Sequence, residues 1–316
     1  MAMPVQRTHV GIDVGKFRLD IATDDGRHLS IENTPKAIGE WLDSLDATGR
    51  IALEATSHYH LELALEAHRR GHEIFLINGY RLNRYRDSIG TRAKTDAGDA
   101  RLLLRYLSRE LDELRPWSPP GKAYRQLQTL LRRRATLVQM RVALQQSLAG
   151  IPALGTSLKR IVAQLKQTDQ LIQKHIHQCL KEAGWETDAK RCQAIEGIGP
   201  VTAASLVTLF HRGSFRNSDA FIAFLGLDVR VRDSGIKSGK RRLTRQGDPE
   251  ARRLLYLAAM QAKRHPAWES FYQRHVARGL APTQALVALA RKLARVAFSL
   301  MQKQTDYVPR TPCGET

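Results

Sequence analysis

Four carboxylates stand where apolar segments end or where a helix is expected to begin. Asp13 ends the apolar segment 10–13, and Glu54 ends a second one at 51–54. Asp96 and Asp99 are three residues apart, which places both on one face of a helix. Carboxylates that gather repel one another, and a bound divalent cation is the usual compensation. Oxygen ligands favour Mg²⁺ or Mn²⁺, so the four acids predict a metal centre suited to phosphodiester displacement.

Each of these acids also has a purely structural interpretation. Asp13 could end a hairpin strand, and Glu54 could cap the helix that follows it. Asp96 suits the first turn of a helix, and Asp99 could pair with a neighbouring arginine. The order of the elements that carry the four acids therefore has to decide between the two interpretations.

The first part of the chain alternates strand and helix patterns. We expect strands at 8–13, 17–23, 27–32, 50–53 and 73–77, with helices at 35–45, 58–70 and 95–109. The first three strands form an antiparallel meander, and the later alternation indicates a sheet covered by helices. An acid on the first strand, another on the fourth strand and a pair on the last helix follow the plan of the ribonuclease-H-like fold, in its RuvC-like branch. Prolines 116, 119 and 120 end this α/β domain at about residues 1–115.

The rest of the chain has a helical pattern. Apolar residues recur every seven positions on both sides of a Gly- and Pro-containing break, at Leu130, Leu137, Leu144, Leu158, Leu165 and Ile172. This spacing predicts an antiparallel helix pair at about 122–149 and 157–183, within an arm of residues 116–188. The pair could be a coiled-coil arm for spacing or oligomerisation, or a plain core hairpin, and the pattern favours neither. A mainly helical domain is expected at 189–316.

The composition indicates a polyanionic partner. The chain has 50 Lys and Arg against 31 Asp and Glu, and a formal net charge of +19, which favours nucleic acid. Nothing approaches the ~20 apolar residues of a membrane span, and the first ten residues lack a signal-peptide core. We therefore expect a cytoplasmic protein with no membrane partner. Three widely separated cysteines lack the paired spacing of a zinc site or disulfide framework.

Two segments are candidates for contact with nucleic acid. Residues 195–204 match a helix-hairpin-helix element, in which Gly197, Gly199 and Thr202 could place backbone N–H groups and a helix N-terminus against a phosphate; a packed structural turn is the alternative. The second segment, 230–245, is basic and contains two glycines, as a functional loop would, although charge runs are often only solvated faces. Its basic residues are Arg230, Arg232, Lys237, Lys240, Arg241, Arg242 and Arg245.

At these residues the chain resembles the IS110/IS1111 family of insertion-sequence transposases. The resemblance is carried by the segments 11–13, 53–56 and 94–100 and by the later region 195–255. It implies that Asp13, Glu54, Asp96 and Asp99 bind the metal of a RuvC-like domain. It also implies a C-terminal transposase domain with a nucleophilic serine, which is Ser234 in this sequence, with Ser238 as the fallback. Because no base lies near Ser234 in the sequence, we expect the metal ions to activate it, which requires the two domains to meet.

The resemblance further implies the partners of the protein. These are DNA, as element ends and target, and a noncoding guide RNA encoded by the element. We also expect a homo-oligomer that is associated with the bacterial nucleoid during action. We expect a transposase, with a site-specific invertase of the same family as the alternative. The sequence does not settle this distinction, because the two differ in DNA substrate and synaptic geometry rather than in chemistry.

Two other functions remain as alternatives. A metal-only Holliday-junction nuclease would cut without the serine, so that Ser234→Ala would leave cleavage intact. A noncatalytic nucleic-acid-binding protein would not need the four acids.

Overall fold

The computed structural model describes residues 8–45, 47–55, 59–90, 95–230 and 241–309. The chain divides into two compact units, Met1–Pro119 and Pro120–Thr316. Ser234 and Ser238 lie outside the described residues, as do Arg232, Lys237 and Lys240. Each unit has its own hydrophobic core and is described by itself.

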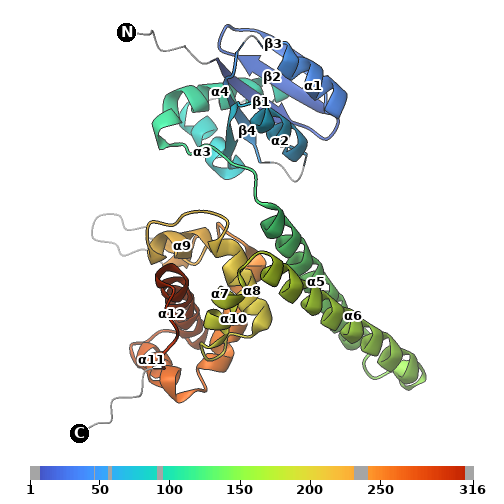
Figure 1. Ribbon diagram of the computed structural model, residues 1–316, viewed down its shortest axis with the longest axis vertical. Coiled ribbons are helices and arrows are strands. Elements are labelled where there is room, and N and C mark those ends of the chain that lie inside the picture. Colours follow the sequence, from blue (N-terminus) through green and yellow to red (C-terminus); the bar gives the residue numbers. More distant parts are fainter. Residues whose placement is uncertain (1–7, 46, 56–58, 91–94, 231–240, 310–316) are drawn as a thin grey trace. The chain divides into compact units, whose positions relative to one another are not determined.

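The first unit contains a five-stranded mixed sheet with the order β3-β2-β1-β4-β5 (Figure 1). β1, β2 and β3 are antiparallel, whereas β1, β4 and β5 are parallel. The expected meander is therefore confirmed, and the sheet is compatible with the predicted ribonuclease-H-like fold. The strands are β1 (His9–Val14), β2 (Arg18–Thr23), β3 (His28–Glu32), β4 (Arg50–Glu54) and β5 (Glu73–Ile77).

Helices pack against both faces of this sheet. α1 and α2 pack on the face that includes Val10, Ile12 and Leu53. α3 and α4 pack on the opposite face, around Ala52 and Phe75. The helices are α1 (Pro35–Asp43), α2 (Leu61–Arg69), α3 (Gly79–Ser88) and α4 (Asp96–Glu110), which is followed by the short 3₁₀ turn η1 (Leu111–Glu113). The sequence did not predict α3.

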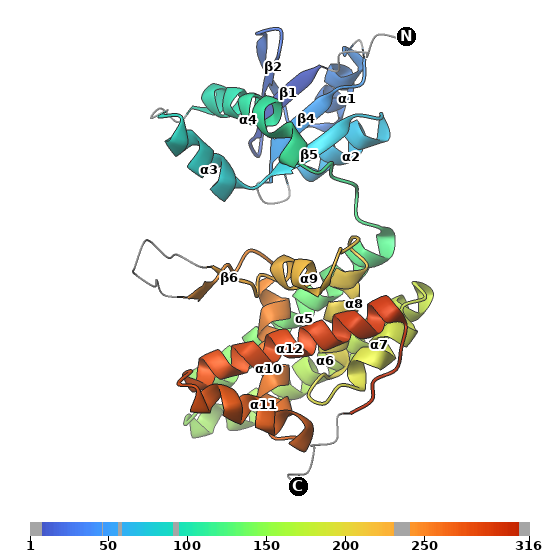
Figure 2. The ribbon, with the colours of Figure 1, turned by 90° about the vertical axis from the view of Figure 1, so that its left-hand side faces the viewer.

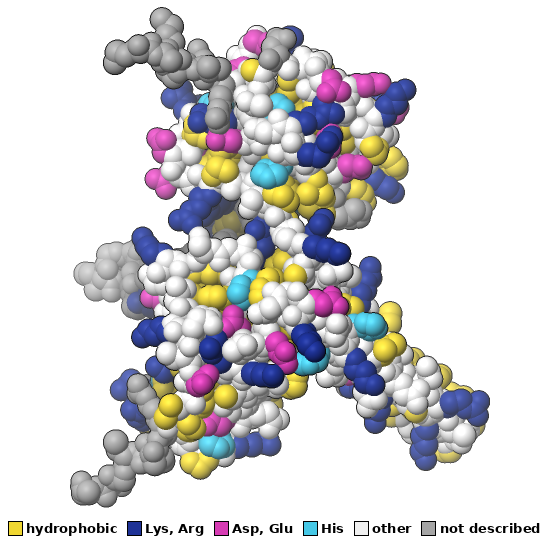
Figure 3. Space-filling model, in the orientation of Figure 1, with side chains coloured by type: hydrophobic (Ala, Val, Ile, Leu, Met, Phe, Trp, Pro, Cys, Tyr) yellow, Lys and Arg dark blue, Asp and Glu magenta, His cyan; other side chains and the backbone are white. Residues whose placement is uncertain are grey.

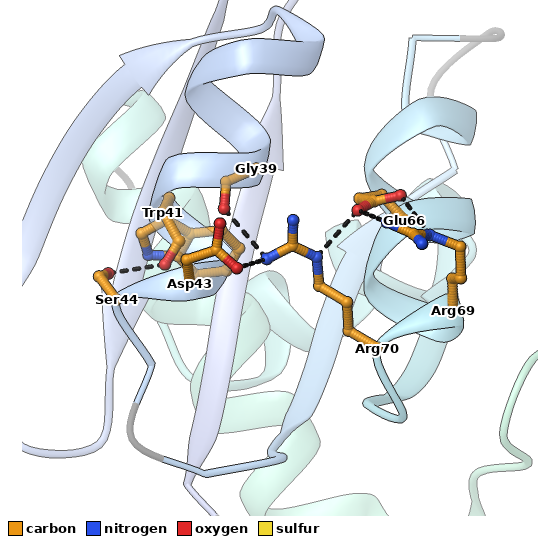
Figure 4. Close-up of polar contacts among 7 residues, drawn as sticks. All are labelled: Gly39, Trp41, Asp43, Ser44, Glu66, Arg69 and Arg70. Carbon is orange, nitrogen blue, oxygen red and sulfur yellow. Dashed lines mark hydrogen bonds and ion pairs between the residues drawn. The ribbon is translucent and has the colours of Figure 1, made fainter.

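An arginine just after α2 joins the two helices on the first face (Figure 4). Arg70 forms an ion pair with Asp43 of α1 and donates to the backbone oxygen of Gly39 over 3.1 Å. Its Nε also donates to Glu66 of α2 over 2.8 Å. This shared guanidinium links α1 to α2 at the surface of the unit.

The second unit is mostly helical (Figure 2). Its central helix, α12, buries ten side chains along one stripe. A two-residue antiparallel ribbon, β6 with β7, was not predicted. The elements are α5 (Lys122–Ser147), η2 (Pro152–Leu154), α6 (Gly155–Glu182), α7 (Glu186–Gln193), α8 (Pro200–Phe210), α9 (Ser218–Phe224), β6 (Val229–Arg230), β7 (Arg242–Leu243), α10 (Pro249–Ala262), α11 (Pro266–Ala277) and α12 (Pro282–Lys303).

α5 and α6 form the expected antiparallel hairpin (Figure 1). Leu127 and Leu131 of α5, and Ile176 and Leu180 of α6, belong to the core of the second unit. Further along the hairpin, apolar side chains such as Met140 are exposed. One end of the hairpin is therefore part of a core, while the other end projects from it. In the described part of the chain, no helix has both the length and the hydropathy needed to cross a membrane.

Candidate functional site

The register of two parallel strands brings two of the predicted acids to one edge of the sheet. Gly11 of β1 pairs with Ala52 of β4, and Ile12 pairs with Leu53. The next residue on each strand is Asp13 and Glu54, respectively. Because side chains alternate along a strand, both acids lie on the face that carries Gly11 and Ala52. This is the face covered by α3 and α4.

Gly11 explains how the second pair of acids reaches the same place. A Cβ at this position would collide with the backbone oxygen of Ala100 and the backbone nitrogen of Leu104 in α4. The absence of a side chain lets the backbone of α4 lie directly on β1. The first turn of α4, which begins at Asp96 and includes Asp99, is thereby held near the end of the strand.

The other three acids lie close enough to Asp13 for their charges to act on its carboxyl. The pKa of its carboxyl is raised to about 6. Burial is the largest cause, followed by the negative charges of Asp99, Asp96 and Glu54. Asp13 is therefore a partly buried acid with other carboxylates in its neighbourhood.

Asp99 has a compensating partner of its own. An Arg86 amino nitrogen of α3 donates to its Oδ1 over 2.6 Å, and only 11% of the Arg86 side chain and 7% of the Asp99 side chain are exposed. Asp96, by contrast, is exposed in the first turn of α4, which is capped by Thr95 through a bond from the backbone N–H of Gly98. The structural interpretation of Asp99 as an ion-paired residue is thus partly right, although its partner is Arg86 in another helix.

Glu54 lies against the start of α3. A Cβ on Gly79, the first residue of that helix, would collide with the Glu54 carboxylate. The absence of a side chain at Gly79 therefore leaves room for an anion near the positive end of a helix dipole. α3 consequently contacts the acidic site twice, through Gly79 at its start and through Arg86 in its last turn.

These residues fit a divalent cation in their chemistry. All four are hard oxygen donors, and the pKa of Asp13 is raised first by burial and then by the charges of the neighbouring acids. In the described residues, no group of three or more side chains is already arranged as metal ligands. Asp13 and Glu54 lie at the ends of neighbouring strands, and Asp99 is held by Arg86. If a metal binds here, Asp13, Glu54, Asp96 and Asp99 are the residues that would hold it.

The sequence interpretation missed two charged residues at this site. Asp20 of β2 is paired with Asp13 in the β1–β2 register and contributes to its raised pKa. The predicted hairpin could have indicated Asp20, since cross-strand partners share a face. Arg86 had no comparable signal, because the helix that carries it was not predicted.

The glycine turn before α8 is packed inside the second unit. Gly197 has φ +87° and lies against the backbone of Ala258 and Ala262 in α10, while the Thr202 side chain is buried. Gly199 has open space around it. The accessible part of the predicted phosphate contact is therefore the backbone at Gly199, and the nucleic-acid role of the turn stays a prediction.

The described part of the basic segment forms the β6–β7 ribbon. Arg230 and Arg242 are paired across it, and Arg241 and Arg242 are exposed. Arg245 follows in a left-handed conformation, with φ 57°. Basic side chains also occur over the surface of each unit (Figure 3). The ribbon thus presents arginines directly before and after the segment that contains both candidate serines.

Comparison with known families covers most of the chain. A transposase model of the IS110 type, designated DEDD, matches residues 10–151. A second model, described as the transposase IS116/IS110/IS902 family, matches residues 189–273. The chain belongs to the IS110 family of transposases. Its activity is therefore that of a DNA transposase or recombinase, and the DEDD designation indicates dependence on a divalent metal.

Individual relatives include both inverting and transposing proteins. The chain is 26% identical to the pilin gene-inverting protein of Moraxella lacunata over 97% of its own length and 99% of the relative. The corresponding protein of Moraxella bovis is 27% identical over the same shares. The transposase for insertion sequence element IS1111A of Coxiella burnetii is 27% identical over 49% of this chain and 44% of the relative.

Proposed function

We propose that this transposase cuts and rejoins DNA through a divalent-metal centre held by Asp13, Glu54, Asp96 and Asp99, with Ser234 as the nucleophile. The observation that carries the proposal is the parallel register of β1 and β4, which brings Asp13 and Glu54 to one edge of the sheet, with α4 packed directly on Gly11 of β1. A divalent cation in such a cluster stabilises charge on the phosphate and lowers the pKa of bound oxygen. Mg²⁺ and Mn²⁺ both suit the donor set.

In the serine mechanism, each bond to phosphorus that breaks is replaced by a new one, so the phosphate remains a diester throughout. The Ser234 hydroxyl oxygen bonds to phosphorus, its proton passes to solvent, and the bond between phosphorus and one sugar oxygen breaks. The sugar oxygen leaves as a hydroxyl. A second strand's hydroxyl then attacks the protein-linked phosphate, which forms the new DNA bond and frees the serine. Arginines of the β6–β7 ribbon, Arg230, Arg241 and Arg242, are suited to stabilise the phosphate charge.

The experiment is a search for protein-linked DNA on denaturing gels. The full chain is incubated with supercoiled element-end DNA and Mg²⁺, with and without candidate RNA. We expect a covalent band that is lost in Ser234→Ala and retained in Ser238→Ala. A band retained in Ser234→Ala and lost in Ser238→Ala would move the role to Ser238. Cleavage without any covalent band would instead support a metal-only nuclease.

A guide RNA and self-association complete the proposal. The net charge of +19 favours polyanionic partners, and the exposed apolar side chains of the α5–α6 hairpin offer a surface for a second copy. Removal of copurified RNA with ribonuclease should abolish recombination, and added element RNA should restore it. Sedimentation of the full chain tests the oligomer.

Site-specific inversion is the second candidate function. It is favoured by the likeness to two pilin gene-inverting proteins along almost the entire chain. A plasmid with two element ends in inverted or direct orientation separates the activities. Inversion of the intervening DNA without excision or insertion would favour an invertase.

A further inference from the structure

The second unit contains a pocket of about 540 Å³ between the β6–β7 ribbon and the beginning of α12. Figure 2 shows β6 and the end of α12 that follows α11. The pocket, here named the ribbon pocket, has basic and apolar walls. The basic side chains are Arg241, Arg242 and Arg291, and the main apolar ones are Leu243, Leu280 and Val287.

Arg291 is the distinctive residue of this pocket. Its Nε atom is buried and has no hydrogen-bond partner among the residues that the structure describes. Burial and the neighbouring Arg295 lower the pKa of the Arg291 guanidinium, although Asp219 and Asp228 act in the opposite direction. Asp219 is 2.6 Å from Arg295, and Asp228 accepts from Thr244. Asp219 is therefore paired with Arg295, and the lining of the pocket contains three arginines and no acid among the described residues.

The beginning of α12 adds to the attraction for an anion. Thr283 and Gln284, in the first turn of the helix, also line the pocket. The N-terminal turn of a helix favours negative charge through its dipole and its unpaired N–H groups. The apolar wall, by contrast, is suited to a flat, weakly polar group. A ligand that satisfies both walls carries an anionic group and a ring.

We propose that the ribbon pocket binds one unpaired nucleotide of a DNA strand, with the base against Leu243, Leu280 and Val287 and the phosphate against the arginines. The volume exceeds that of a single base, and a basic wall beside an apolar surface suits one phosphate and one base. The ligand is DNA because the family acts on DNA. The proposal deepens the proposed function but does not depend on which serine reacts.

Some residues that line the ribbon pocket flank, in the sequence, the segment that contains the candidate serines. Val229 precedes the segment 231–240, Arg241 and Arg242 follow it, and all three line the pocket. That segment contains both candidate serines. A nucleotide bound in the ribbon pocket would therefore contact residues next to that segment in the sequence.

The test measures binding to a fluorescent 12-nucleotide single strand and to its duplex by anisotropy, with the full chain and no metal. Ala288→Leu narrows the pocket without changing the charge. Loss of the contact between one base and the apolar wall corresponds to roughly tenfold in affinity. We expect Ala288→Leu and Arg291→Ala each to weaken single-strand binding about tenfold and duplex binding less than twofold. A strand with abasic sites should bind the wild type and Ala288→Leu equally.

The matched control is Arg274→Ala, which removes one positive charge from an exposed position of α11 outside the pocket. Thermal melting establishes that each variant is folded. Equal weakening of single strand and duplex in the pocket variants would overturn the proposal in favour of a general phosphate contact. Tighter binding of matched single-stranded RNA, lost in the same variants, would also overturn the choice of DNA. Since no cleavage is measured, failure of the serine mechanism would leave this result unaffected.

Discussion

The guanidinium of Arg86 lies 2.6 Å from the carboxylate of Asp99, and both side chains are nearly buried. This ion pair stands inside the acidic site, so one predicted metal ligand is already bound to a cation of the protein. A divalent ion that binds Asp99 must compete with Arg86 or share the carboxylate with it. Arg86 is thus a positioning residue that also limits the charge of the site.

Replacement of Arg86 should make the protein less stable without metal and more responsive to metal. Arg86→Ala leaves Asp99 buried and unpaired, which costs about 3 kcal/mol. Mn²⁺ should therefore raise the melting temperature of Arg86→Ala more than that of the wild type. Arg81→Ala, an exposed change in the same helix, is the control. An identical Mn²⁺ response in wild type and Arg86→Ala would contradict this role.

The raised pKa of Asp13 predicts a pH dependence of stability. Its ordinary value is 3.8, and its value in the folded chain is about 6. The folded state therefore binds more protons than the unfolded state between about pH 4 and 6, and this contribution to stability falls as pH rises through that window. Because Asp13 is only partly buried, solvent screening reduces this contribution to the free energy of unfolding to about 1 kcal/mol. Between pH 5 and pH 7, the free energy of unfolding measured with denaturant should decrease less in Asp13→Asn than in the wild type. An unchanged decrease would contradict the assignment.

Gly11 should be intolerant of any side chain. Gly11→Ala drives a methyl group into the backbone of α4, so we expect a loss of about 3 kcal/mol in unfolding free energy. Gly39→Ala is the matched control in the same unit, because it lies inside α1 with only the end of Arg70 nearby. That change should be neutral or stabilise by up to about 1 kcal/mol. Equal effects of the two changes would exclude the close approach of α4 as the cause.

The α5–α6 hairpin contains a buried ion pair. Arg134 and Asp169 are 2.8 Å apart and 15% and 11% exposed, although this contact is poorly aligned for a hydrogen bond. Arg134→Met should destabilise by about 3 kcal/mol because Asp169 is left without a cation. Arg134→Met with Asp169→Leu should recover most of the loss, as measured by denaturant unfolding. A double variant as unstable as the single one would show that the pair contributes more than charge compensation.

The sequence predicted the sheet and the acids for a common reason. The apolar segments that end in Asp13 and Glu54 identify two strands and the residues at which they end. Because β1 and β4 pair in parallel, both acids lie at the same edge of the sheet. α3 gave no such signal, since Leu82 is its only buried side chain. Arg86 was missed with it. The β6–β7 ribbon was missed because two residues per strand are too few for a period to be visible.

The most direct test of the account is divalent-metal binding by the four acids together. Mn²⁺ is titrated into the full chain and into Asp13→Asn, Glu54→Gln, Asp96→Asn and Asp99→Asn, and binding is followed by calorimetry. The account predicts that each single change weakens Mn²⁺ binding by at least about tenfold, whereas Asp112→Asn, at an exposed acid outside the site, does not. Mn²⁺ binding that is unchanged in all four variants would contradict the metal centre.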